Sequence, residues 1–233
     1  MADEMQTLLD EVKEFRDWKT KQSLQEQGFI VFEKQEGLWR VRNRPRPSVS
    51  SGISSSLDEW CFVHDDGTKA FEETFDTAGP FYEGLASVSL EGAAFHITHG
   101  GYRAYTESFD MAGPFSEGVA PVIKNLLGDP QESYHIKRDG TPAYTERYEL
   151  VDGFSEGLAP AKLRSAEFHI TYAGKPAYVR RFQKVSKFRD GAAHAELNGQ
   201  IMLINHDGEL IQVLGNVPSG TRCGDYWRYD PIE

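Results

Sequence analysis

Three histidines are the residues of this chain that could most readily do chemistry. His96, His135 and His169 are each followed by isoleucine, and they stand 39 and 34 residues apart. Imidazole is the commonest metal ligand, and three imidazoles around one ion would form an open zinc site. The matching positions nearer the two ends hold Phe62 and Leu203, so the position accepts an apolar side chain. The pattern therefore favours packed, hydrogen-bonded structural histidines, and we expect neither a metal nor a cofactor.

A second set of candidates is acidic. In four places a phenylalanine is followed two residues later by an acid and then a glycine, and these acids are Glu83, Glu117, Glu156 and Asp190. Paired carboxylates could do general acid/base work, but catalysis needs a unique constellation and not a fourfold copy. Repetition indicates instead that these acids serve a turn by accepting backbone N–H groups. Since the sequence also lacks GxSxG, P-loop, dinucleotide-binding and HExxH motifs, we expect no catalytic residue and no enzyme activity.

The elements that must position these residues are repeats. A glycine recurs at steps of 34, 39, 34 and 34 residues, at Gly67, Gly101, Gly140, Gly174 and Gly208. Fourteen residues after each of the first four stands a phenylalanine: Phe81, Phe115, Phe154 and Phe188. Three residues later comes another glycine: Gly84, Gly118, Gly157 and Gly191. A fixed period in this range predicts a repeat architecture, and we interpret these residues and the three histidines as its structural framework.

One unit can be followed along the chain. Residues 119–123 and 133–137 are short apolar segments typical of strands, Asp139-Gly140 is a hairpin-type turn, and residues 142–146 return as a third strand. Such a sheet is too small to be stable alone, so neighbouring units must stack. We therefore predict an all-β fold of three-stranded antiparallel units of about 34 residues in an open twisted array. A small five-bladed propeller-like ring is the alternative.

The unit resembles the WG (Trp-Gly) repeat family, which is known from many bacterial proteins. The matching residues are Phe75-Asp76, Phe109-Asp110, Gly84-Leu85-Ala86, Gly118-Val119-Ala120 and Gly157-Leu158-Ala159. The resemblance covers residues 29–212 as about five divergent units, without the Trp-Gly pair itself. It implies a β-rich repeat domain, usually with no assigned activity, and no catalytic residue.

The ends of the chain differ from the repeats. Residues 1–27 read as an amphipathic helix, which either caps the array or serves docking or dimerisation; its apolar stripe is Met5, Leu8, Leu9, Val12, Phe15 and Trp18. Residues 28–212 form the repeat domain, with a polar insertion at 43–57. Residues 213–233 read as a C-terminal cap or a partner-binding tail.

Composition restricts the partners. A formal net charge of −11 argues against nucleic acid, and no apolar run is long enough to cross a membrane. Two distant cysteines and an acidic N-terminus without a signal peptide indicate the cytoplasm.

The leading functional hypothesis is a non-enzymatic scaffold that binds protein partners. Its candidate interaction surface is Arg103, Tyr105, Tyr144, Tyr178, Arg180 and Arg181. A glycan-binding repeat protein is the alternative, and a metal-dependent enzyme that uses the histidines is a third. The oligomeric state stays open.

Overall fold

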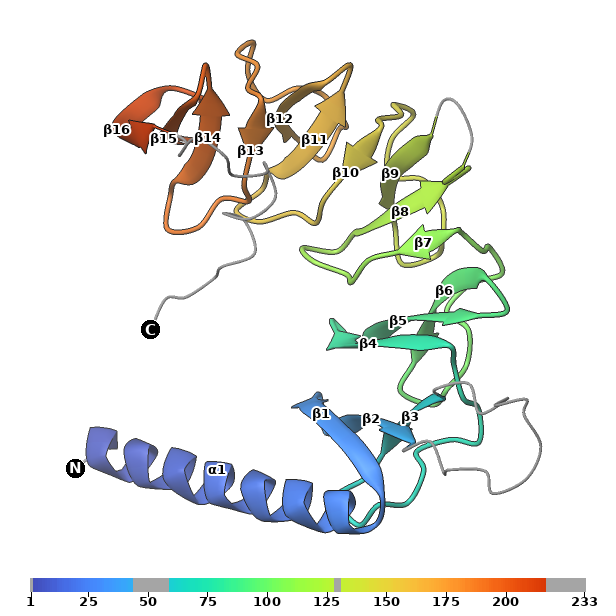
Figure 1. Cartoon of the computed structure of the whole chain (residues 1–233). Coiled ribbons are helices and arrows are strands. Elements are labelled where there is room, and N and C mark those ends of the chain that lie inside the picture. The colour runs from blue at the N-terminus through green and yellow to red at the C-terminus, as the bar shows by residue number, and fades with distance from the viewer. Residues whose placement is uncertain (1, 44–58, 128–130, 217–233) are drawn as a thin grey trace. The chain divides into compact units, whose positions relative to one another are not determined.

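The computed structural model describes residues 2–43, 59–127 and 131–216. In these residues the chain has one helix and five small antiparallel sheets of three or four strands (Figure 1). It divides into two compact units, Met1–Ser108 and Phe109–Glu233. Most of the predicted insertion and of the predicted C-terminal cap, including Cys223, lies outside the described residues.

The first unit begins with the helix α1 (Ala2–Glu26). Its first sheet has the order β1-β2-β3, with strands β1 (Phe29–Gln35), β2 (Leu38–Asn43) and β3 (Trp60–Val63). Its second sheet has the order β4-β5-β6, with strands β4 (Thr77–Tyr82), β5 (Leu85–Leu90) and β6 (Ala93–Thr98).

The second unit holds three sheets. The first contains β7 (Met111–Ala112), β8 (Ala120–Lys124) and β9 (Glu132–Ile136). The next contains β10 (Leu150–Val151), β11 (Ala159–Leu163) and β12 (Ala166–Ile170). The last contains β13 (Lys184–Val185), β14 (Ala193–Leu197), β15 (Gln200–Ile204) and β16 (Leu210–Asn216). The predicted fold class, tandem three-stranded units after an N-terminal helix, is confirmed.

One strand of the predicted unit is wrong. Residues 142–148 touch β9 at only two bridges, Ile136 with Pro142 and Ser133 with Tyr148, and between them the chain forms an arch. A second arch, residues 176–182, follows β12 in the same way. The third strand of each sheet is instead the short segment after the arch, such as β10, which pairs with β11.

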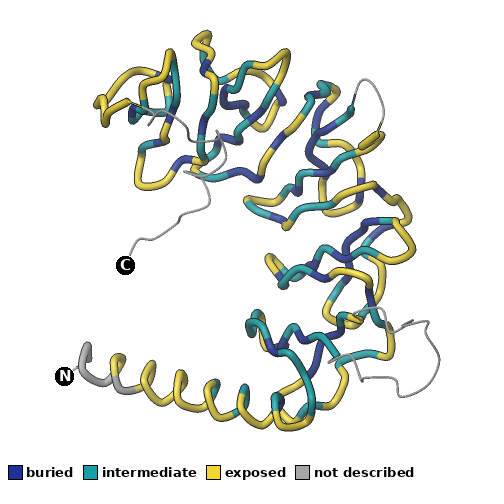
Figure 2. The backbone as a smooth tube through the Cα atoms, in the orientation of Figure 1, coloured by how far each residue is buried: buried dark blue, intermediate teal, exposed yellow. Residues whose placement is uncertain are grey.

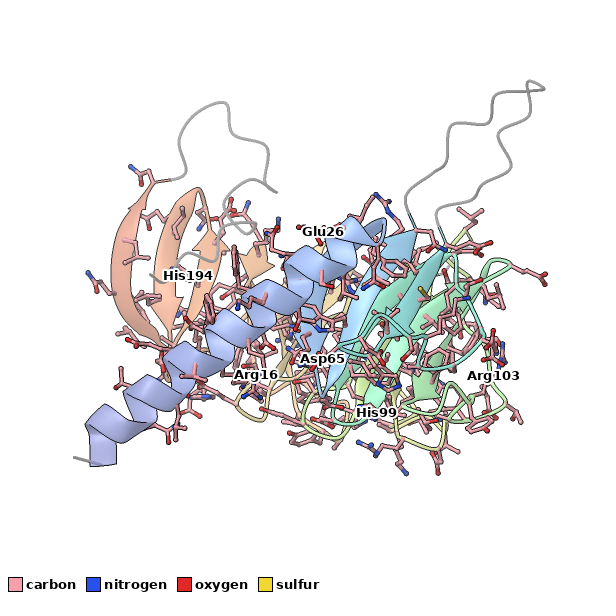
Figure 3. All side chains as sticks on the ribbon, turned by 90° about the horizontal axis from the view of Figure 1, so that it is seen from below. Arg16, Glu26, Asp65, His99, Arg103 and His194 are labelled. Carbon is pink, nitrogen blue, oxygen red and sulfur yellow. The ribbon has the colours of Figure 1, made fainter. Side chains whose placement is uncertain are left out.

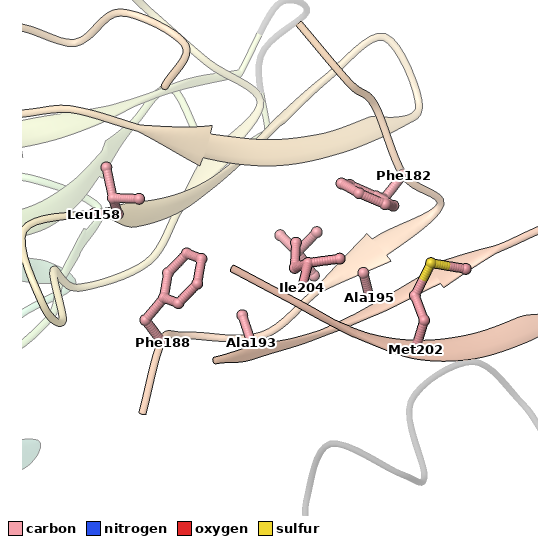
Figure 4. Close-up of a cluster of buried hydrophobic side chains, with 8 residues drawn as sticks. Leu158, Phe182, Phe188, Ala193, Ala195, Met202 and Ile204 are labelled. Atoms are coloured by element: carbon pink, nitrogen blue, oxygen red, sulfur yellow. The ribbon is translucent and has the colours of Figure 1, made fainter. Parts of the chain in front are cut away.

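Burial follows the strand period. The middle strands β8 and β11 alternate buried and partly exposed residues, as expected where one face packs inward. The strands that carry the histidines are buried almost throughout (Figure 2). Between the last two sheets, Leu158 packs with Phe182, Phe188 and Ile204 in a shared apolar core (Figure 4). These two sheets therefore bury their apolar faces partly against each other, as repeat units must.

The glycines that recur with the repeat share one backbone conformation. All nine glycines that define the repeat have positive φ, between 70° and 85°. Glycine adopts this conformation at little steric cost, because it has no Cβ. At Gly174 a Cβ would also come within 2.4 Å of the Tyr144 ring, so the turn of one repeat lies against the aromatic residue of the previous one.

Candidate functional site

The three repeated histidines are fully buried. Their Nδ1 atoms lie 2.5, 2.6 and 2.5 Å from the hydroxyl oxygens of Tyr105, Tyr144 and Tyr178, respectively. Nε2 of His135 lies 2.9 Å from the backbone oxygen of Asp152, and since a carbonyl only accepts, Nε2 carries the proton. Nδ1 then accepts the tyrosine hydroxyl. Both ring nitrogens are thus used inside the fold.

His135 and His169 stay neutral at physiological pH. Burial lowers the pKa of His135 and of His169 to about 4 in each case. Among the residues that the structure describes, no three His, Cys, Asp or Glu side chains come together in a way that could hold a metal ion. The observed role of these histidines is to hydrogen-bond within their own repeat.

The predicted surface of tyrosines needs correction. Tyr105 and Tyr144 are each only 8% exposed, and Tyr178 is partly buried, because each hydroxyl turns inward to a histidine. Burial also raises the pKa of all three hydroxyls. The sequence did contain a signal for this pairing, because each tyrosine follows its histidine by nine residues. In the first repeat, phenylalanine replaces both partners, and Phe62 packs on Phe71 at 5.7 Å between ring centroids.

The three arginines of the predicted surface are exposed. Two of them, Arg103 and Arg181, also stack on buried aromatic rings. Arg181 stacks 4.0 Å from the centroid of the Phe168 ring and donates from Nη1 to three backbone carbonyls of its arch. Arg147 does the same over Tyr134, at 3.8 Å. Arg103 stacks over Phe95 at 3.7 Å (it is labelled in Figure 3). Arg180 makes a longer contact, in which its Nη1 lies 3.4 Å from the backbone oxygen of Gly208.

Three glutamates connect successive turns. Glu36, Glu117 and Glu156 each sit at positive φ in their own turn and accept N–H groups from the turn of the following sheet. Glu117 accepts from the amide of Gly157 at 3.0 Å, and Glu156 accepts from that of Gly191 at 3.1 Å. Glu36 likewise accepts from Gly84 at 2.9 Å. The acids therefore do accept backbone N–H groups, but those of the next turn along the chain.

An aromatic stack supports each of these carboxylates. His99 stacks on Phe81 at 4.2 Å, and its Nε2 lies 3.1 Å from Glu36. Tyr172 stacks on Phe154 at 4.3 Å and donates its hydroxyl to Glu117 at 2.5 Å. His206 repeats the arrangement with Phe188 and Glu156. This three-part contact occupies carboxylates that general acid/base catalysis would need to be free.

A groove lies between the two arches of the second unit. Its volume is about 490 Å³, and the side chains that line it carry four cations and one acid among the described residues: Arg147, Arg164, Lys175, Arg181 and Glu146. Lys175 forms an ion pair with Glu146, and this contact lowers the pKa of that carboxyl. At the base, the Tyr148 hydroxyl donates to the backbone oxygen of Gly174 at 2.5 Å, which joins the two repeats.

The turn at the mouth of this groove has an unusual backbone. Arg164 and Ser165 both have positive φ, 51° and 65°. Every other described turn with two successive positive φ values has glycine at its second position, as in Asn198-Gly199. A left-handed conformation costs a residue with a Cβ about 1 kcal/mol or more. This turn therefore holds strain that the corresponding turns of other repeats avoid.

The helix presents a separate surface. Its last turn buries Leu24 with Val31 and Trp39 of the first sheet. Lys34 bridges Asp17 and Asp65, of which Asp65 is labelled in Figure 3. The stripe predicted for this helix is exposed where it is described, with Leu9 59%, Val12 50%, Phe15 57% and Trp18 56% exposed. Met5 and Leu8 lie outside the described side chains.

Helical geometry explains why the stripe is left open. At 3.6 residues per turn, Val12 and Phe15 lie about 140° and 160° around the axis from Asp17, the residue that faces the sheet. The helix therefore packs on the first sheet through its C-terminal turns, around Leu24, and its apolar stripe stays exposed. None of the described helices could span a membrane.

Comparisons with solved structures show only distant likeness. KlHsv2 with loop 6CD replaced by a Gly-Ser linker is 9% identical, with a TM-score of 0.46; the match covers 81% of this chain and 68% of that one. A protein of unknown function from Bacteroides caccae is 12% identical, with a TM-score of 0.41 and coverage of 69% and 70%. Prolyl oligopeptidase B from Galerina marginata is 11% identical, with a TM-score of 0.43 and coverage of 81% and 35%. No curated protein matches the sequence.

A family model gives the more specific result. The model described as "WG containing repeat" matches residues 60–92 and 108–125. The first match runs from β3 through β5, and the second covers β7 and β8, so both lie on the structural repeat. The resemblance found in the sequence is thereby confirmed at two segments: residues 60–92 and 108–125 are similar to the WG containing repeat.

Proposed function

We propose that the chain is a non-enzymatic binding protein that engages a protein partner through the exposed apolar face of α1. One observation carries the proposal: Leu9, Val12, Phe15 and Trp18 are each at least half exposed on a helix that packs on the first sheet only near its C-terminal end, at Leu24. Single exposed apolar residues are ordinary, but a contiguous stripe on a helix is typical of a docking surface. The partner surface that fits is an apolar groove that receives a helix.

The other two hypotheses lose support from the geometry. Glycan binding rests on exposed aromatic pairs, whereas two of the three predicted tyrosines are buried. A metal-dependent enzyme needs histidine nitrogens that are free, whereas those of His135 and His169 are hydrogen-bonded. We also retain the cytoplasm as the proposed location, because the buried Cys61 is a free thiol, as is usual in a reducing compartment.

Site-specific photocrosslinking tests the proposal on the full chain. A benzophenone amino acid replaces Phe15 in one variant and Tyr102, which is 77% exposed on the repeats, in the other. We expect one protein to crosslink from position 15 and not from position 102. Crosslinking of the same protein from both positions would contradict a helix-specific site.

Matched substitutions then test the stripe itself. Phe15→Ser/Trp18→Ser should abolish copurification of the crosslinked partner, while Asp10→Ser/Glu14→Ser should preserve it. Both pairs change two exposed residues of the same helix, so circular dichroism should show equal helix content. Equal loss in both variants would sink the proposal. A crosslink to a second copy of the chain would instead assign the stripe to self-association.

A further inference from the structure

The groove between the two arches of the second unit departs from the repeat in charge. Lys175 occupies the position directly after a turn glycine, where the other repeats have Thr68, Tyr102, Thr141 or Glu209. Arg164 occupies the first position of a turn that elsewhere holds Glu91 or Asn198. Neither position holds the same residue in all repeats, so the fold does not require a particular side chain there. In this repeat both positions carry a cation, and the two cations lie at one groove.

We propose that this groove binds a ligand that carries a carboxylate or phosphate group, with Arg164 and Lys175 as its contact residues. The proposal concerns a different surface from α1 and does not depend on the proposed docking of that helix. Guanidinium and ammonium groups are the side chains that best bind such oxyanions. In a chain of net charge −11, a groove with a positive lining is also the place to which an anion would be drawn.

Two of the four cations are already fixed in position. Arg147 and Arg181 each stack on a buried ring and donate from Nη1 to three carbonyls. Ordering them costs nothing further when a ligand binds, so their charge is preorganised. Arg164 is exposed, and among the described residues its guanidinium makes no hydrogen bond or ion pair. It is therefore available to an incoming anion.

The acids near the groove each have a partner. Glu146 pairs with Lys175, and Glu149 accepts the backbone N–H of Arg164 at 2.7 Å. Glu132 lies 4.0 Å from Nε of Arg147. The Lys175 side chain is 66% exposed, so it can turn from Glu146 toward a ligand without unpacking the fold. The protein's own acids therefore neutralise only part of the positive charge that lines the groove.

The size and the walls of the groove indicate a small ligand with an apolar part. A volume of about 490 Å³ lies in the usual range for small-molecule sites. Leu163, Ala166 and Pro176 add apolar surface beside the cations. The backbone strain at Arg164 and Ser165 is located at the same groove, where sites that bind ligands often keep it.

Titration of the full chain tests the proposal. The probes are phenyl phosphate and phenylacetate, with benzyl alcohol as the neutral control, and binding is followed by calorimetry and amide chemical shifts. We expect the two anions to bind, the alcohol not to bind, and added salt to weaken the anions. Arg164→Asn/Lys175→Thr should weaken binding at least about tenfold, as for the loss of charge-assisted hydrogen bonds.

The controls keep the test specific. Both replacements copy residues that corresponding turns of this chain already carry, so the fold should persist. Lys137→Asn removes an exposed cation of the same unit away from the groove, and it should leave binding unchanged. Absence of anion binding at millimolar concentration, or equal weakening by Lys137→Asn, would overturn the proposal.

A last comparison distinguishes two sources of the anion. A short peptide with glutamates on both sides of a phenylalanine is titrated beside phenylacetate. Much tighter binding of the peptide would assign the groove to an acidic protein segment. Equal or weaker binding would assign it to a free small anion.

Discussion

The hydroxyl oxygen of Tyr144 lies 2.6 Å from Nδ1 of His135, and both side chains are buried inside one repeat. The same hydroxyl accepts the backbone N–H of His135 at 3.2 Å. One tyrosine thus satisfies a ring nitrogen and a backbone amide that water cannot reach. The pair acts as a polar unit of the core, in which each partner makes burial of the other tolerable.

Removal of one partner should therefore cost more than removal of both. We expect Tyr144→Phe to lower the free energy of unfolding by about 1–3 kcal/mol, because Nδ1 of His135 is left buried without a partner. The double variant His135→Phe/Tyr144→Phe should recover part of this loss, since the first repeat already packs Phe62 on Phe71. Urea unfolding of the two single variants and the double variant gives the coupling free energy. Additive losses would show that the two residues do not act as a pair.

Stability should fall as the pH drops from about 6.5 to about 4. The folded pKa of His135 and of His169 is lowered to about 4, below the ordinary value of 6.5, so between these values the unfolded chain binds more protons. The stabilising effect is complete above the unfolded pKa and is lost as pH falls toward the folded one. It is on the order of 2–3 kcal/mol for each histidine.

Thermal melts across this pH range measure the effect. The variant His135→Phe/Tyr144→Phe supplies the control, because it removes one of the two titrating groups and should show a shallower slope. An unchanged slope would assign the acid sensitivity to other residues.

At the strained turn we expect a substitution to raise the free energy of unfolding and not to lower it. Ser165→Gly should stabilise the chain by roughly 1 kcal/mol, because glycine adopts φ of 65° without the penalty of a Cβ. Gly199→Ser, in the equivalent turn of the next repeat, should destabilise it by a similar amount. Denaturant melts of the two variants measure both changes. The same sign for both would contradict the strain argument.

The glutamate contacts can be tested at single amides. Glu117→Ala removes the acceptor for the amides of Glu156 and Gly157. We expect hydrogen exchange at these two amides to accelerate and the free energy of unfolding to fall by about 1 kcal/mol. Glu107→Ala, which changes an exposed acid of the first unit, is the control and should leave both amides unchanged. Protection that persists at Gly157 would show that the carboxylate is dispensable.

Much of the framework could be predicted from the sequence because it depends on local chemistry that repeats. The turn glycines mark positions of positive φ, and the apolar alternation of residues 119–123 marks a strand that the structure has as β8. The buried histidines also follow from the apolar residues at the same position in the outer repeats. Each of these features can be read from one unit and checked in the next.

The arches could not be predicted in this way. Arg147 satisfies the carbonyls of its arch from a side chain, and no periodicity in the strand pattern reports such a contact. The burial of Tyr144 depends on the same arch, so its assignment to a surface was wrong for the same reason. The groove depends on which charges meet across two neighbouring repeats, and that juxtaposition appears only once the units are stacked.

The contact from Glu117 to Gly157 also determines how the array can change its length. It joins the turn of one repeat to the turn of the next, and Glu156 to Gly191 is the same contact one step further on. Such a bond is head-to-tail: the repeat that holds Glu156 and Gly157 receives the carboxylate of Glu117 from the repeat before it and gives its own carboxylate to the repeat after it. A whole repeat can then be added or removed in phase, and the new neighbours meet through the same pair of groups. This contact therefore sets no limit of its own on how many repeats can follow one another.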